Sequence, residues 1–356
     1  SLTKLNLLVA TFRLWKNLIT EWEKPEIDFR IYCRNSLGRL ELLAILKGEK
    51  FDFVIGNPPY VEAKRLPKKD KLICRINFPD VARGAFDIYV CFIKLGLALL
   101  RESGYLGYVL PDKFLVTKYA YFVRKKILDD HRLIEICDIS NLRYFKGTDV
   151  YPILLTVKNE KPNEKKVRVI CNLASRNIFE SKKFDFVRIE QEKYKLFESL
   201  PFYCLENELD KEIFFKILAN VKNRLSDFLH LKTTVSFHFK GLRERFVCKD
   251  LESPNKFKYL GGKSYSRKNE VDAYKVEWEG YFINYDIEAL KKLNNPLPPI
   301  CNFIRPKIIF CQHAKRMLAY CDFKGEWITK DVYPIAFIKG PENLRKTYYY
   351  TGFLNS

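Results

Sequence analysis

FDFVIGNPPY, residues 51–60, sets the architecture of the N-terminal half of this chain. Its first five residues are nearly all apolar, which is typical of a strand buried on both faces of a sheet. Gly56 then loosens the backbone, and two consecutive prolines prevent a strand or a helix from continuing. Asn57 and Tyr60 are left at the carboxyl end of the strand, where open α/β sheets bind their ligands.

Strands and helices alternate around this stretch. The order predicts an α/β fold with a parallel sheet covered by helices on both faces. Residues 61–78 are basic and are predicted to form a loop. The other predicted strands cover residues 27–33, 105–111, 133–139 and 151–159, and the predicted helices cover residues 4–20, 39–48, 87–104 and 121–128.

A polar segment broken by proline, KNEKPNEKK at residues 158–166, is typical of a domain boundary. We therefore divide the chain into residues 1–160 and residues 161–356. The second part contains one predicted amphipathic helix at residues 208–225, followed by short β-like runs rich in aromatic side chains. It is predicted to be a mixed α+β domain.

The composition limits the function classes. A hydrophobic fraction of 47% with 15% aromatics excludes a disordered chain, and 63 Lys+Arg against 43 Asp+Glu give a net charge of +20. This charge favours a polyanionic partner, although a generally lysine-rich surface would look the same. No apolar run reaches the ~18 residues of a membrane span, and no secretory signal opens the chain.

The ten cysteines are scattered without a CxxC pair and are accompanied by only four histidines. This pattern predicts buried free thiols rather than a metal site or disulfides, and therefore a reducing cytosol. Cys301, Cys311 and Cys321, which are equally spaced, are included in that prediction.

NPPY after an apolar strand resembles the catalytic motif of S-adenosylmethionine-dependent amino-methyltransferases. It is most similar to that of adenine-N6 DNA methyltransferases of the TaqI-like and fused restriction–modification type. Residues 31–37, 86–115 and 136–159 resemble the flanking motifs, in the right order. Residues 261–265, 279–286, 305–322 and 350–356 resemble the target-recognition domain of the same group.

The resemblance covers nearly the whole chain. It implies a partial Rossmann-like methyltransferase sheet with flanking helices at residues 1–160. A mixed α+β target-recognition domain, truncated at its C-terminus, would follow at residues 161–356.

The chemistry of the motif is intelligible. An adenine amino group is a poor nucleophile because its lone pair is delocalised into the ring, and two acceptors placed at its hydrogens free that lone pair. The resemblance assigns these acceptors to the Asn57 side chain and the Pro58 carbonyl, and a cofactor contact to Pro59. Tyr60 would stack on a base rotated out of the duplex. The alternative is a strand-ending turn with Tyr60 as a rim aromatic.

Three further residues are assigned by the resemblance. Phe145 would hold the extruded base edge-on, unless it is a core phenylalanine. Asn35 and Ser36 would contact S-adenosylmethionine. The family often has an acid at the position of Asn35, so the amide is a departure, and Asn35 would otherwise cap the following helix.

Basic residues interleaved with aromatics suit phosphate neutralisation and base packing. Taken singly, each of these residues could be an ordinary solvated side chain. The predicted contacts to DNA are Lys64 and Arg65 beside NPPY, and Lys263, Tyr265, Arg267, Arg305, Lys307, Lys315 and Arg316 in the second part.

The glycine-rich cofactor loop of the family is absent before residues 31–37. We therefore expect a sheet with an exposed edge at residues 51–55. We also expect that residues 1–356 alone bind S-adenosylmethionine weakly and are inactive. An N-terminal segment or a separate subunit would supply the loop.

The resulting hypothesis is a site-specific DNA adenine-N6 methyltransferase of a prokaryotic restriction–modification system. It would be cytoplasmic, act on double-stranded DNA and need neither a metal nor a membrane. Two alternatives stay open: the same chemistry on RNA or on a protein glutamine, and a non-catalytic DNA-specificity fragment.

Overall fold

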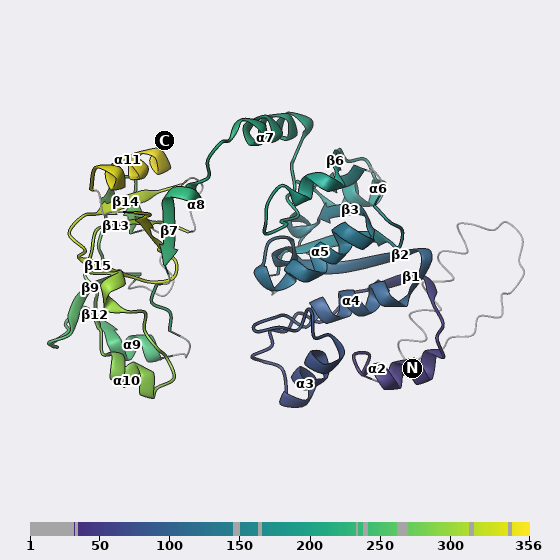
Figure 1. The fold of residues 1–356 in the computed structure, drawn as a ribbon, viewed down its shortest axis with the longest axis horizontal. Coiled ribbons are helices and arrows are strands. Elements are labelled where there is room, and N and C mark those ends of the chain that lie inside the picture. Colours follow the sequence, from purple (N-terminus) through teal and green to yellow (C-terminus); the bar gives the residue numbers. More distant parts are fainter. Residues whose placement is uncertain are drawn as a thin grey trace, which may run out of the picture. The chain divides into compact units, whose positions relative to one another are not determined.

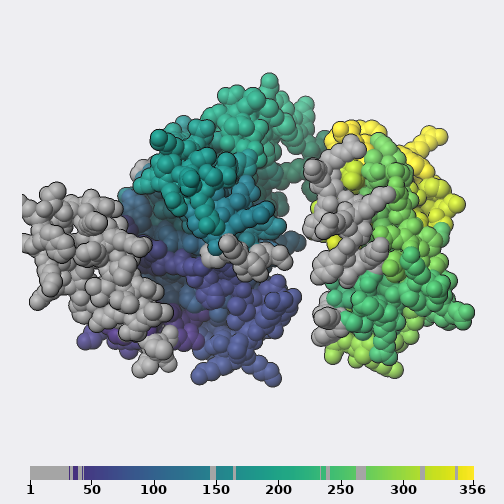
Figure 2. Space-filling model, turned by 180° about the vertical axis from the view of Figure 1, so that it is seen from behind, coloured from purple at the N-terminus to yellow at the C-terminus, as the bar shows by residue number. Residues whose placement is uncertain are grey.

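The computed structural model describes residue 32 and residues 35–144, 150–162, 166–232, 234–237, 241–261, 270–312, 317–340 and 344–356, without the side chains of residues 39–41 and 43. The chain forms two compact units, Ser1–Ala219 and Asn220–Ser356 (Figures 1 and 2). The helix predicted at residues 4–20 and nearly all of the strand predicted at residues 27–33 lie outside the described residues.

A six-stranded mixed sheet forms the centre of the first unit, in the order β1-β2-β4-β3-β5-β6 (Figure 1). The four predicted strands that can be examined are confirmed. The sheet is not all parallel, however, because β4 runs antiparallel to both β2 and β3. The described residues between β3 and β4 form no α-helix that could carry a parallel crossover. The strands are β1 (Phe51–Gly56), β2 (Leu100–Pro111), β3 (Arg132–Asp138), β4 (Pro152–Lys158), β5 (Lys166–Ile170) and β6 (Val187–Glu190).

Helices α4 and α5 pack on one face of this sheet, and α6 lies by a smaller apolar cluster that includes Cys137 and Ile170. The basic segment predicted as a loop contains α3. Cys74 is the buried residue of this helix, and the charged side chains that surround the apolar ones led us to predict a loop. The helices are α2 (Arg39–Leu46), α3 (Lys68–Asn77), α4 (Tyr89–Leu99), α5 (Tyr121–Asp130), α6 (Arg176–Ser181) and α7 (Glu208–Asn220), with 3₁₀ turns η1 (Asp112–Leu115), η2 (Lys118–Ala120) and η3 (Ser140–Leu142).

Strand β1 is the edge strand of the described sheet, in agreement with the edge expected at residues 51–55. It is not buried on both faces, which corrects the prediction made from its apolar run. Phe53 is 65% exposed and Ile55 is 81% exposed. Val54 packs against the core on the opposite face. Phe53 stacks on Tyr105 of β2, with the ring centroids 5.9 Å apart.

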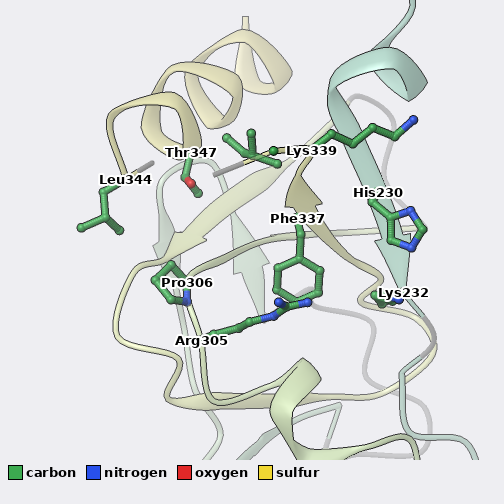
Figure 3. Close-up of a pocket in the computed structure, with 10 residues that line it drawn as sticks. His230, Lys232, Arg305, Pro306, Phe337, Lys339, Leu344 and Thr347 are labelled. Atoms are coloured by element: carbon green, nitrogen blue, oxygen red, sulfur yellow. The ribbon is translucent and has the colours of Figure 1, made fainter. Parts of the chain in front are cut away.

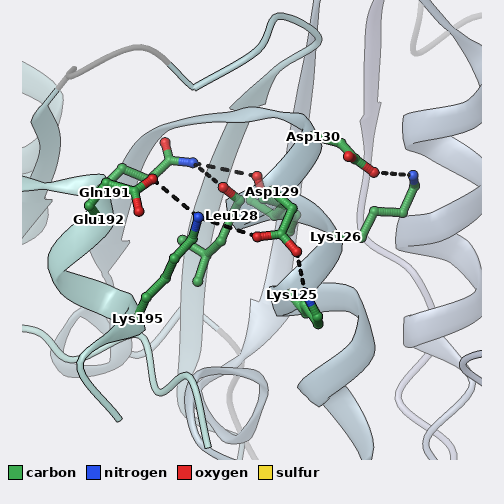
Figure 4. A network of polar contacts seen from close by, with 9 residues as sticks. Lys125, Lys126, Leu128, Asp129, Asp130, Gln191, Glu192 and Lys195 are labelled. Atoms are coloured by element: carbon green, nitrogen blue, oxygen red, sulfur yellow. Dashed lines mark hydrogen bonds and ion pairs between the residues drawn. The ribbon is translucent and has the colours of Figure 1, made fainter. Parts of the chain in front are cut away.

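The first unit extends well beyond the boundary expected at residue 160. The polar segment there only connects β4 to β5, and β6 is followed by η4 (Gln191–Lys195), which packs on α5. Gln191 is buried and donates to the carbonyls of Leu128 and His131 at 3.3 and 2.8 Å (Figure 4). Its own oxygen accepts from the Leu133 amide at 2.8 Å. A buried amide with these partners fixes residues after 160 to the first sheet.

Arg124 of α5 is fully buried and donates to the backbone carbonyls of Phe114, Leu200 and Ser199 at 2.6, 2.7 and 3.0 Å. Burial lowers the pKa of its guanidinium to about 10. Arg124→Met would leave three backbone carbonyls without this donor, one buried and two partly buried, so we expect the free energy of unfolding to fall by about 3 kcal/mol. Urea unfolding followed by circular dichroism measures this.

Lys126→Met is the matched control on the same helix. Lys126 forms an exposed pair with Asp130 at 2.8 Å (Figure 4), so its loss should change the unfolding free energy by less than about 1 kcal/mol. Equal effects of the two variants would contradict a structural role for Arg124.

The second unit is a mixed α+β body, as predicted, with sheets in the orders β15-β9-β12-β8 and β14-β13-β16-β7 and a β10-β11 hairpin. The helix predicted at residues 208–225 is shorter than expected, since it ends as α7 at Asn220, where the second unit begins. The strands are β7 (Leu229–Lys232), β8 (Val247–Cys248), β9 (Lys256–Leu260), β10 (Val271–Asp272), β11 (Lys275–Val276), β12 (Phe282–Asn284), β13 (Lys307–Phe310), β14 (Ala319–Asp322), β15 (Trp327–Thr329) and β16 (Ile335–Ile338). The helices are α8 (Leu225–Phe228), α9 (Leu242–Phe246), α10 (Ile287–Lys292) and α11 (Leu344–Asn355), with a 3₁₀ turn η5 (Ile300–Asn302).

None of the helices that the structure describes is long and apolar enough to cross a bilayer. The described cysteines are free thiols. Cys311 and Cys321 are buried as predicted, whereas Cys301 is exposed. Within the described ranges, no group of three or more His, Cys, Asp or Glu side chains could hold a metal ion.

Candidate functional site

The Asn-Pro-Pro-Tyr loop follows β1 directly, at the carboxyl end of that strand. Asn57 and Pro59 are exposed, Pro58 is buried and Tyr60 is half-buried. The parallel pairing places Gly56 opposite Tyr108 of β2, so the loop begins beside the last residues of β2. The tandem prolines fix the backbone between the strand end and Tyr60.

Tyr60 holds the amide of Asn57. Its hydroxyl lies 2.6 Å from Asn57 Oδ1 and 2.9 Å from the Val109 carbonyl oxygen. Burial, with a smaller contribution from the charge of Asp87, raises the pKa of Tyr60 to about 12. The hydroxyl is therefore protonated at neutral pH and donates. An amide oxygen has two acceptor positions, so Asn57 Oδ1 can accept one further hydrogen bond.

Asp87, which lies just before α4, forms a hydrogen bond with the residue that follows the Asn-Pro-Pro-Tyr loop. Its Oδ1 accepts from the Val61 amide at 2.8 Å. The Ala63 amide donates to the Phe86 carbonyl at 2.7 Å, and the Ile88 amide donates to the Val61 carbonyl at 3.0 Å. Burial raises the pKa of Asp87, while the backbone N–H groups that it accepts from oppose the rise. These bonds restrict the chain immediately after the motif.

A cluster of aromatic side chains packs against the Tyr60 ring. Tyr89 is fully buried and meets the Tyr60 ring edge-on, with centroids 6.2 Å apart. The hydroxyls of Tyr89 and Tyr119 lie 2.9 Å apart, and Phe114 packs edge-on against Tyr89. The sequence analysis included Asp87 and Tyr89 in the flanking motif at residues 86–115 but gave them no role. Both residues lie at the start of the helix predicted at residues 87–104, the first predicted after the Asn-Pro-Pro-Tyr loop, and this position could have indicated that they support the loop.

Asn35 has a local role in the structure. Its Oδ1 accepts from the Leu37 amide at 3.1 Å, and the Gly38 amide donates to its carbonyl at 3.0 Å, just before α2. This is an Asx turn before α2. Because Leu37 precedes the helix, the side chain of Asn35 does not cap it in the structure. Ser36 beside it is exposed. A cofactor contact by either residue stays a prediction.

The predicted DNA contacts have different surroundings. Lys64 and Arg65 are exposed, and Lys64 pairs with Glu62 at 2.7 Å. Lys307 is buried and bonded to Asp322, so we remove it from the set of phosphate contacts. The apolar strand Lys307–Phe310 carries it inward. Arg305 is half-buried, with its guanidinium 3.8 Å from the centroid of the Phe337 ring.

Six predicted residues cannot be placed. The structure does not describe them, so their roles stay predictions. They are Phe145, Lys263, Tyr265, Arg267, Lys315 and Arg316.

Comparisons with known proteins bear on both units. A family model described as Eco57I restriction-modification methylase matches residues 2–145. The type II restriction enzyme and methyltransferase RM.Eco57I of Escherichia coli is 24% identical over 255 residues, which are 66% of this chain and 24% of that protein. The type II methyltransferase M.BstVI of Geobacillus stearothermophilus is 35% identical over 124 residues, 34% of this chain and 22% of that protein.

Among solved structures, the type IIL restriction-modification enzyme MmeI in complex with DNA matches with a TM-score of 0.50 at 9% identity. The match covers 81% of this chain and 41% of that chain, and at this identity it shows the fold alone. The chain thus has a methyltransferase-like sheet followed by a second mixed domain. It spans about a quarter of the length of the two curated relatives named here.

Proposed function

We propose that this chain is part of a type II restriction–modification methyltransferase of the Eco57I type, which methylates the exocyclic N6 of adenine in double-stranded DNA. The family match over residues 2–145 and the two methyltransferase relatives support the reaction class. The choice of adenine rests on the NPPY loop and its chemistry.

The single observation that carries the proposal is the exposed Asn57 amide at the carboxyl end of β1, with its oxygen 2.6 Å from the Tyr60 hydroxyl. That oxygen and the Pro58 carbonyl accept the two hydrogens of the amino group. The nitrogen then becomes pyramidal, and its lone pair is free to attack a methyl carbon. A nitrogen–carbon bond forms, a carbon–sulfur bond breaks, and the nitrogen later loses one proton to solvent.

The target adenine must leave the duplex to reach this loop. Tyr60 is half-buried and supported by Tyr89, so its ring offers a fixed surface for stacking. In the present arrangement its hydroxyl already donates to Asn57 Oδ1. The entering amino group takes the second acceptor position, or it replaces the Tyr60 hydroxyl, whose single proton then turns to the Val109 carbonyl.

S-adenosylmethionine supplies the methyl group as a sulfonium. The described residues offer only part of a site for it. Pro59 is exposed beside the reacting amide, whereas the oxygen of Asn35 is engaged by the Leu37 amide. We therefore propose that this chain supplies the two acceptors for the amino group, at Asn57 and Pro58, and the stacking surface for the base, at Tyr60. We propose that the main cofactor-binding loop lies outside residues 1–356.

Labelled methyl transfer tests the proposal. The full translated reading frame is incubated with duplex DNA and S-adenosylmethionine carrying a labelled methyl group, and the DNA is digested to nucleosides. We expect the label in N6-methyladenine. Label in N4-methylcytosine would contradict the assigned base. Label on RNA or on a glutamine of a protein substrate, but not on DNA, would favour the alternative substrates.

Asp87 positions the Asn-Pro-Pro-Tyr loop through its hydrogen bond with the Val61 amide. Asp87→Ala removes the acceptor of the Val61 amide, so we expect kcat for methyl transfer to fall about tenfold. KM for DNA should change little because Asp87 contacts no substrate. Asp87→Asn keeps an acceptor oxygen and should restore most of kcat. A variant that lowers stability but leaves kcat unchanged would show that Asp87 only supports the fold.

A further inference from the structure

The second unit contains a basic pocket that the methyl-transfer reaction does not use. Its cavity has a volume of about 570 Å³ and lies between β7, β16, the start of β13 and the start of α11 (Figure 3). His230, Lys232, Arg305 and Lys339 supply nitrogen donors, and Phe337 and Thr347 are among the other lining residues. No acidic side chain is present among the ten lining residues drawn in Figure 3.

Strand geometry explains why these donors converge. Side chains two residues apart lie on the same face of a strand, so His230 and Lys232 project from one face of β7. β7 pairs antiparallel with β16, where Phe337 lies opposite His230. Lys339 follows directly after β16, and Arg305 lies just before β13. Four donors from three segments that are distant in sequence therefore line one cavity.

Arg305 is fixed within the pocket. Its guanidinium carbon lies over the Phe337 ring, 3.8 Å from the centroid, and both side chains are drawn in Figure 3. Phe337 is buried, so the cation is held by a rigid surface. Lys232 and Lys339 form no ion pair within the part of the chain that the structure describes. Their charges are therefore not neutralised by a neighbouring carboxylate there.

The start of α11 adds to the positive potential. Leu344 is the first described residue of this helix and lines the pocket, as does the buried Thr347 one turn later. The amino end of a helix carries a partial positive charge, which favours an anion nearby. The cavity is therefore lined by three positively charged side chains, an imidazole and the end of a helix. No negatively charged side chain is among the lining residues drawn in Figure 3.

We propose that this pocket binds a phosphodiester of the DNA backbone and thereby anchors the second unit on the duplex. The inference rests on the proposed function, because DNA is the polyanion that the methyltransferase would hold. Lysine and arginine contacts to phosphates fix the position of a protein on DNA without reading the sequence. The pocket would accordingly set affinity and register, and base recognition would come from other residues.

The test measures DNA affinity against salt. The 356-residue chain is titrated with a labelled duplex by fluorescence anisotropy at several salt concentrations. The variants are Lys232→Gln/Lys339→Gln and the control Lys292→Gln, which removes an exposed lysine of α10 that does not line the pocket. Each lost phosphate contact lowers the slope of log K against log salt by about 0.9. We expect a loss of nearly two in the double variant, with affinity at least about tenfold weaker for every duplex sequence.

Two outcomes would overturn the pocket assignment while the proposed function stands. One is wild-type slope and affinity in the double variant. The other is an affinity loss limited to particular sequences, which would indicate base contacts instead of phosphate contacts. Inorganic phosphate and adenosine monophosphate serve as competitors. Tight competition by either, with duplex affinity unchanged in the double variant, would identify a site for a free anion and overturn the assignment to DNA.

Methyl transfer by the full reading frame separates this inference from the proposed function. If the wild type methylates DNA and the double variant does so with raised KM and unchanged kcat, both are supported. If no methyl transfer occurs but the salt slope still falls in the double variant, the proposed reaction fails and the phosphate pocket stands.

Discussion

Asn57→Ala is expected to reduce methyl transfer to DNA by a factor of about 10² to 10³, the usual effect of removing one preorganised hydrogen-bond partner from a reacting group. The substitution removes the exposed oxygen that we assign to the amino group and leaves the strand and the prolines intact. Single-turnover transfer of a labelled methyl group measures the chemical step. DNA affinity, measured by anisotropy, should change little, because the role that we propose for Asn57 is in the chemical step.

Asn57→Asp is the matched comparison. A carboxylate keeps an acceptor oxygen at the same place and can still accept from the Tyr60 hydroxyl, so it should retain more activity than alanine. If Asn57→Ala transfers methyl groups at the wild-type rate, the Asn-Pro-Pro-Tyr loop is a strand-ending turn and the catalytic assignment is wrong.

The second large effect is expected on stability. Asp322→Ala should lower the free energy of unfolding of the second unit by about 3 to 5 kcal/mol, because it leaves the buried ammonium of Lys307 unpaired. Lys307 is bonded to Asp322 Oδ2 and, at 2.5 Å, to the Phe303 carbonyl. Asp322 also accepts from the amides of Glu326 and Trp327, both at 3.1 Å. Thermal unfolding followed by tryptophan fluorescence reports on this unit when Trp15→Phe and Trp22→Phe leave Trp278 and Trp327 as the probes.

Glu326→Ala is the control for this experiment. Glu326 forms an exposed pair with Lys258 at 3.4 Å, and its loss should change the unfolding free energy by less than about 1 kcal/mol. A small effect of Asp322→Ala would mean that Lys307 reaches water, and would return it to the candidate DNA contacts.

Strong local patterns made much of the first sheet predictable. The apolar runs of β2, β3 and β4 and the helices α4 and α5 lie close to their expected positions. The direction of β4 was not predictable, since a run of apolar residues does not encode the direction of its partner. The burial of β1 was overestimated because Phe53 and Ile55 look like core residues, whereas exposure depends on whether another segment covers them.

The site was predictable where the chemistry is carried by consecutive residues. Asn57 and Tyr60 lie at the end of a strand and contact each other, as a compact motif allows. Residues whose role depends on distant partners were missed or misassigned. Lys307 looked like a surface cation until its partner fifteen residues away was located, and the pocket around Phe337 joins segments that no local pattern connects.

The two units consist of continuous ranges that divide between Ala219 and Asn220, so the backbone passes from one to the other only once. A single crossover in the gene at that point would exchange the second unit and leave both cores intact. If the second unit selects the target sequence, as its resemblance to a target-recognition domain implies, a recombined mosaic of this kind would acquire a new target sequence in one event. The recognised DNA sequence would then change while the residues of the methyl-transfer site stay the same.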